Sequence, residues 1–177
     1  REEAVSKLKT AVNWHFVYRR DYLIQHDLFL YPGIINEDNE YVFRVFFFAK
    51  EIRYIPYAHY IYTLMRTGSV TTVNFKATEK RLNAALTTLD SWKQFADKYV
   101  KTEKDARFYY GFRYKMIIEL LLLKNSDKQS DLYRTYLLEK RSWRKWFISS
   151  FFKARDFSIK NIMRLLVVLF YPQHYKQ

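Results

Sequence analysis

The feature that most constrains the fold is a series of apolar residues that recur at helical spacing from Thr78 to near the end of the chain. Four such stretches predict four helices. Thr78 is placed to cap the first, and the second opens at the capping-box pattern Thr102-x-x-Asp105. The third covers about 131–147 and the fourth covers 158–170. Because short polar connections favour antiparallel packing of neighbouring helices, the sequence predicts a helical bundle here.

The part of the chain before Thr78 has a less regular pattern. Apolar residues keep to one side of residues 1–25, which predicts a helix. The Pro32-Gly33 pair predicts a turn or extended segment. Further on, stretches rich in Ile and Tyr at 52–55 and 58–65 predict two short strands.

The change of pattern divides the chain into two regions, 1–77 and 78–177. A length of 177 residues suits one domain, or one domain with a small second one. The content of 49% hydrophobic and 20% aromatic residues is enough to build a core. The predicted fold class is therefore mainly α (α+β), with a short strand pair followed by a helical bundle.

Composition excludes several kinds of site. The chain contains no cysteine, which excludes disulfides and thiolate metal sites and makes a reducing cytosol the simplest setting. Its three glycines leave no room for a glycine-rich phosphate loop.

The longest apolar runs fall short of the roughly 20 residues that a membrane-spanning helix needs. The net charge of +13 favours an acidic partner, which is nucleic acid, anionic lipid or a phosphate-bearing substrate.

Residues 36–49 predict the central helix of the first region. Asn36 is placed to cap it, and the acidic residues Glu37, Asp38 and Glu40 fill its first turn. The helix dipole and the free backbone N–H groups are expected to hold such a carboxylate ionised. This setting suits a general base as well as a cap, and spacing alone favours the cap.

A series of landmarks places these carboxylates in a wider context. They are, in order, Trp14 leading into Tyr18-Arg19-Arg20-Asp21-Tyr22-Leu23, Pro32-Gly33, Glu37-Asp38, the stretch 52–62, and Arg66-Thr67-Gly68-Ser69-Val70-Thr71. In this order and spacing, residues 13–72 resemble the acceptor-side half of a bacterial family 2 glycosyltransferase, that is, the C-terminal edge of its GT-A-type catalytic domain.

The resemblance implies an inverting glycosyltransferase of the hexosyltransferase type. Such an enzyme transfers a sugar from a nucleotide-sugar donor to a glycan or lipid-linked acceptor in surface polysaccharide synthesis. The family's general base is the Asp of a Glu-Asp pair, which is Asp38 here, with Glu37 supporting it. Arg66 and Ser69 would contact the donor diphosphate or the acceptor. The family usually has two arginines separated by one residue, and here Leu64 stands at the earlier position.

The chain lacks the Asp-x-Asp motif with which the family binds its nucleotide sugar and a divalent cation, Mg²⁺ or Mn²⁺. We therefore expect that motif and the cation in an N-terminal half outside this chain, and we expect this chain alone to bind no metal and to be inactive. The start at Arg1 without a methionine also favours a fragment of a longer protein.

The tail from residue 140 combines basic and aromatic residues. The basic residues are Lys140, Arg141, Arg144, Lys145, Lys153, Arg155, Lys160 and Arg164, and the aromatic residues are Trp143, Trp146, Phe147, Phe151, Phe152 and Phe157. The pattern is typical of a solvated basic face. It is also typical of a cytoplasmic protein whose residues 140–177 make peripheral contact with the inner face of the membrane. Nucleic-acid contact is a less favoured interpretation. The alternative function is a non-enzymatic basic helical module that binds nucleic acid or anionic membrane.

Overall fold

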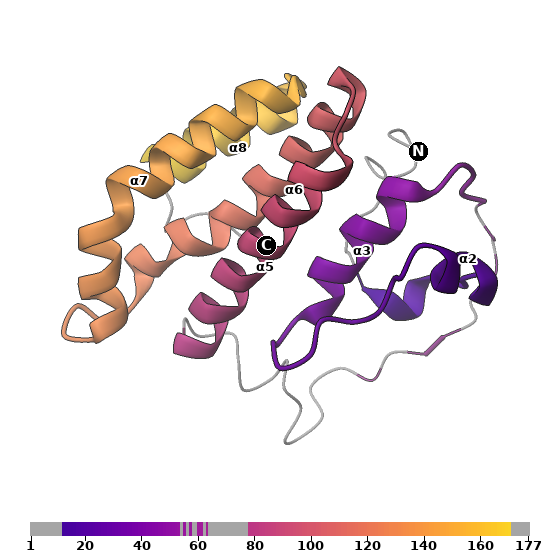
Figure 1. Cartoon of the computed structure of the whole chain (residues 1–177). Coiled ribbons are helices and arrows are strands. Elements are labelled where there is room, and N and C mark those ends of the chain that lie inside the picture. The colour runs from indigo at the N-terminus through magenta and orange to yellow at the C-terminus, as the bar shows by residue number, and fades with distance from the viewer. Residues whose placement is uncertain are drawn as a thin grey trace. The chain divides into compact units, whose positions relative to one another are not determined.

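The computed structural model describes residues 12–53, 55, 57, 60, 61, 63 and 78–170 (Figure 1). The chain divides into two compact units, Arg1–Val73 and Asn74–Gln177. Regular structure in the described residues is helical throughout, so the protein is mainly α. None of the described helices combines the length and the apolar composition that crossing a bilayer requires.

The first unit contains the short 3-10 helix η1 (Asn13–His15), α2 (Arg20–Gln25) and α3 (Glu37–Phe48). The predicted continuous helix over 1–25 is wrong for the residues between η1 and α2. There the backbone is extended, with φ −128° and ψ 145° at Phe16 and φ −70° and ψ 123° at Arg19. Residues 1–11 of this predicted helix lie outside the described residues.

The packing of aromatic side chains explains this extended segment. The Phe16 ring meets Phe46 of α3 edge-on at 5.0 Å between centroids, and the Tyr18 ring meets Tyr41 of α3 in the same way at 5.9 Å. Val17, which lies between them, is 81% exposed. This alternation has the two-residue period of an extended chain, which places both rings on α3.

The segment that leads into α3 is also fixed by contacts within the first unit. The Tyr22 hydroxyl of α2 donates to the Val45 carbonyl, and the His26 ring stacks on Phe48 at 4.4 Å. The predicted turn at Pro32-Gly33 is confirmed, and Gly33 adopts a φ of 81°. Only glycine adopts this conformation without strain, which explains the residue at this position.

The second unit consists of α5 (Glu79–Tyr99), α6 (Glu103–Leu121), the 3-10 turn η2 (Leu122–Asn125), α7 (Asp131–Ala154) and α8 (Ile159–Phe170). These elements confirm the four predicted helices, although α7 extends past residue 147 to Ala154. Thr78 caps α5 by accepting a hydrogen bond from the Arg81 amide, and the Thr102–Asp105 capping box of α6 is formed in both directions.

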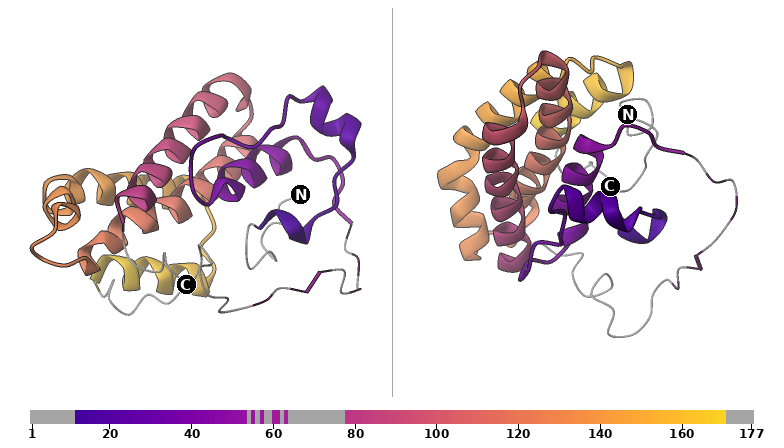
Figure 2. Two further views of the ribbon diagram at one scale, coloured as in Figure 1. Left: turned by 90° about the horizontal axis from the view of Figure 1, so that it is seen from below. Right: turned by 45° about the vertical axis from the view of Figure 1, so that its right-hand side comes forward.

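The core of the second unit lies where α6 packs between α5 and α7, which run beside it in Figures 1 and 2. Its largest buried side chains are aromatic and come from all three helices: Trp92, Tyr114, Trp143, Phe147 and Phe151. The Tyr114 ring contacts Phe147 and Phe151 edge-on at 6.1 and 5.5 Å. Burial of these rings explains how three helices joined by short connections form one unit.

The predicted strand pair is not found in the described residues. Residues 52, 53 and 55 carry no strand, and most of the second predicted strand, 58–65, lies outside the described residues. β-Branched and aromatic composition favours a strand only where a neighbouring strand provides pairing. Of the predicted fold class, the described residues therefore support the mainly helical character and not the strand pair.

Candidate functional site

The candidate site lies at the start of α3. Asn36 occupies the position before the helix, in the left-handed conformation with φ 56°, and its side chain makes no capping hydrogen bond. The expected Asn36 side-chain cap is therefore wrong. Instead, the amide of Asn39 donates to the Asn36 carbonyl and to Asp38 Oδ1, both at 3.0 Å.

Asp38 is a half-buried carboxylate whose pKa is raised. Burial is the main cause, and the negative charge of Glu37 adds to it, whereas the hydrogen bonds from the backbone amides of Asn39 and Asp38 oppose the shift. The expectation that the helix start holds this group more firmly ionised is thus wrong in direction, because burial outweighs the helix-start amides. A raised pKa makes Asp38 a stronger base than an ordinary carboxylate.

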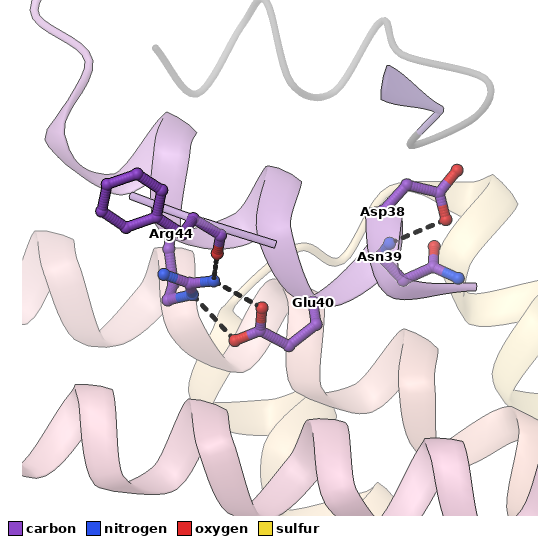
Figure 3. A network of polar contacts seen from close by, with 5 residues as sticks. Asp38, Asn39, Glu40 and Arg44 are labelled. Carbon is purple, nitrogen blue, oxygen red and sulfur yellow. Dashed lines mark hydrogen bonds and ion pairs between the residues drawn. The ribbon is translucent and has the colours of Figure 1, made fainter. Parts of the chain in front are cut away.

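Glu40, the third acid of the first turn, has a different environment (Figure 3). Its side chain is 0% exposed. Arg44 Nε donates to Glu40 Oε1 at 2.8 Å and Arg44 Nη2 donates to Oε2 at 2.7 Å. Arg44 Nη2 also donates to the Phe29 carbonyl at 2.6 Å, which ties the preceding segment to the helix. These contacts assign Glu40 a structural role, so it is a poor candidate for proton transfer.

Tyr18, which the sequence did not indicate as a site residue, interacts electrostatically with Asp38. The Tyr18 hydroxyl donates to Asn13 Oδ1 at 3.2 Å, and its ring packs against Tyr41. Burial, then the neighbouring Tyr41 and Asp38 groups, raise the pKa of Tyr18. The signal in the sequence is the Phe16-Val17-Tyr18 alternation, which the predicted helix over 1–25 does not take into account.

The other predicted site residues are Glu37, Arg66 and Ser69. Glu37 is half-buried next to Asp38 at the start of α3. Arg66, Ser69 and the atypical Leu64 lie outside the described residues. Within the part of the chain that the structure describes, no three His, Asp or Glu side chains come together as a metal-binding group would require.

The basic aromatic tail separates into core and surface. Trp143, Phe147 and Phe151 are buried in the second unit, whereas Trp146, Phe152 and Phe157 are exposed. Only the exposed aromatic side chains are available to a partner.

The chain was also compared with known protein families, with curated proteins and with solved structures. None of these comparisons finds a match.

Proposed function

We propose that this chain is the acceptor-side, C-terminal portion of an inverting glycosyltransferase of the bacterial family 2 type. In this proposal the intact cytoplasmic enzyme transfers a sugar from a nucleotide sugar to a glycan or lipid-linked acceptor, and Asp38 is the general base. The observation that carries the proposal is the environment of Asp38, a half-buried carboxylate of raised pKa in the first turn of α3.

The chemistry requires one proton acceptor on this side of the reaction. As the acceptor hydroxyl attacks the anomeric carbon, its proton passes to the Asp38 carboxylate, and the nucleoside diphosphate leaves with the electrons of the broken bond. A base whose pKa is raised toward the working pH accepts this proton more readily than an ordinary carboxylate. Burial and the Glu37 charge both raise the pKa of Asp38.

The donor side is assigned to a part of the enzyme outside this chain. In this proposal, residues outside this chain bind the divalent cation of the family. When bound in such an enzyme, the cation neutralises the leaving diphosphate. The contribution of Arg66 and Ser69 to diphosphate or acceptor binding stays a proposal from resemblance.

Nucleoside diphosphate release by the intact protein, measured over a panel of nucleotide sugars, tests the proposal. Asp38→Asn should lower turnover by about 10²-fold or more, because it removes the general base. Asparagine retains an oxygen that accepts the Asn39 amide, so the helix start is kept. The matched control is Asp90→Asn, the same substitution at an exposed position of α5, and it should leave turnover unchanged. Near-normal turnover by Asp38→Asn would remove this residue from the mechanism.

A further inference from the structure

Helix α8 presents its apolar side to solvent. Five of its apolar side chains are between 40% and 83% exposed: Ile159, Ile162, Met163, Leu166 and Phe170. At about 100° per residue they fall within an arc of about 100° on one side of the helix. We call these five residues the α8 stripe. Apolar helix faces are ordinarily buried, so a continuous exposed stripe of this kind marks an interaction surface.

The opposite side of α8 faces the protein and carries polar groups. Asn161 and Val168 are buried, and Arg164 Nη1 donates to Asn161 Oδ1 at 3.3 Å. Lys115 of α6 stays accessible to solvent, yet the protein atoms around its ammonium group, and next the charge of Arg164, lower its pKa. The burial of Asn161 and Val168 shows which side of α8 faces the rest of the second unit. The α8 stripe is therefore directed outward by the fold.

The surface around the stripe is apolar and basic. Phe152 and Phe157 are exposed just before α8, with ring centroids 5.9 Å apart. Lys153, Arg155 and Lys160 are exposed in the same stretch. Residues 140–170 contain eight Lys and Arg but only one acid, Asp156.

The excess of positive charge favours an anionic partner for this surface. A second copy of the chain would bring the same excess of positive charge against itself, which costs free energy at an interface. An anionic lipid surface supplies the opposite charge and an apolar layer together. A short helix with an apolar stripe and flanking Lys and Arg is the pattern of a helix that lies in the plane of a membrane interface.

We propose that α8 docks on an anionic bilayer, with the α8 stripe among the acyl chains and Lys153 and Lys160 at the lipid phosphates. Phe152 and Phe157 extend the apolar contact at the start of the helix. This narrows the membrane contact to α8 and its approach, because Trp143, Phe147 and Phe151 belong to the core. The inference does not depend on the proposed glycosyltransferase activity.

The absence of cysteine allows a direct test of insertion. Met163→Cys, labelled with an environment-sensitive fluorophore, is mixed with vesicles of roughly one part phosphatidylglycerol to two parts phosphatidylcholine. Its emission should shift to the blue with these vesicles, and much less with phosphatidylcholine alone. The matched control is labelled Leu138→Cys, an exposed site on α7, which should not shift. No shift at position 163, or equal shifts at both positions, would overturn the proposal. A shift without vesicles that grows with protein concentration would assign the stripe to a second copy and overturn it as well.

Co-sedimentation with the same anionic vesicles separates the apolar contact from net charge. Leu166→Glu should weaken binding by about tenfold or more, because it places a carboxylate among acyl chains and removes apolar contact. Leu138→Glu makes the same charge change away from the stripe and should alter binding only slightly. Both positions are exposed, so both variants should keep their helix content. Equal losses in the two variants would mean attraction by net charge alone and would overturn the docking of the α8 stripe.

Discussion

Arg44 donates to both carboxylate oxygens of Glu40 from one turn further along α3, at 2.8 and 2.7 Å. This pair distinguishes Glu40 from the other two acids of the same helical turn. Glu40 is enclosed and forms an ion pair with Arg44, whereas Asp38 is half-buried next to Glu37 and has a raised pKa. Glu40 therefore stabilises the helix, whereas Asp38 is the acid for which we propose a role in proton transfer.

Arg44→Met should destabilise the first unit by about 3 kcal/mol, because it removes the positive charge of Arg44 and both hydrogen bonds that it donates to the enclosed Glu40 carboxylate. It also removes the hydrogen bond to the Phe29 carbonyl. The free energy of unfolding, from urea titration followed by circular dichroism, measures the effect. The control is Arg53→Met, which breaks the highly exposed pair with Glu51 and should leave stability unchanged. Equal effects of the two variants would contradict the structural role of the Glu40–Arg44 pair.

Asp38→Asn should increase stability at neutral pH. Because the pKa of Asp38 is raised in the folded state, the ionised carboxylate destabilises the fold, and wild-type stability falls as the pH rises through that pKa. The amide carries no charge and avoids this cost. The gain should therefore disappear at a pH below the pKa of Asp in the unfolded chain, where the wild-type carboxyl is neutral in both states. Urea titrations of both proteins at several pH values test this, and a loss of stability at neutral pH would contradict it.

Arg81→Met should destabilise the second unit in a pH-dependent way. Arg81 Nη2 of α5 lies 3.1 Å from Glu119 Oε2 of α6. Burial raises the pKa of Glu119 and the Arg81 charge opposes that rise. Removing the arginine should raise this pKa further and make ionised Glu119 costlier in the fold. The loss of stability should thus be present at neutral pH and shrink as the pH falls through the pKa of Glu119. A loss that is independent of pH would indicate a role in packing instead.

Trp143→Ala and Trp146→Ala should differ sharply, although both tryptophans belong to α7. Trp143 is 2% exposed and Trp146 is 40% exposed. Trp143→Ala should cost about 3–5 kcal/mol, because it leaves a cavity in the core. Trp146→Ala should cost much less, since part of its ring already faces solvent. Thermal or urea unfolding followed by circular dichroism compares them, and similar losses would contradict the assignment of Trp143 to the core.

The sequence predicted the second unit well because its signals are local. Thr78 and Thr102 act through residues three positions away, and the apolar spacing of α5 to α7 reports burial directly. The segment at 16–19 and the pKa of Asp38 depend on contacts distant in the chain. Phe16 and Tyr18 are extended because α3 offers rings to pack against, and burial of Asp38 outweighs its local helix-start contacts. Helical periodicity carries no information on the extended segment at 16–19 or on the pKa of Asp38.

The pH dependence of kcat/KM for sugar transfer by the intact protein tests the role of Asp38 most directly. Its acid limb reports the pKa of the essential base in the free enzyme. Because the Glu37 charge raises the pKa of Asp38, Glu37→Gln should move this limb to lower pH while transfer continues on the plateau. An acid limb that stays in place or moves to higher pH in Glu37→Gln would contradict the assignment of Asp38 as the base.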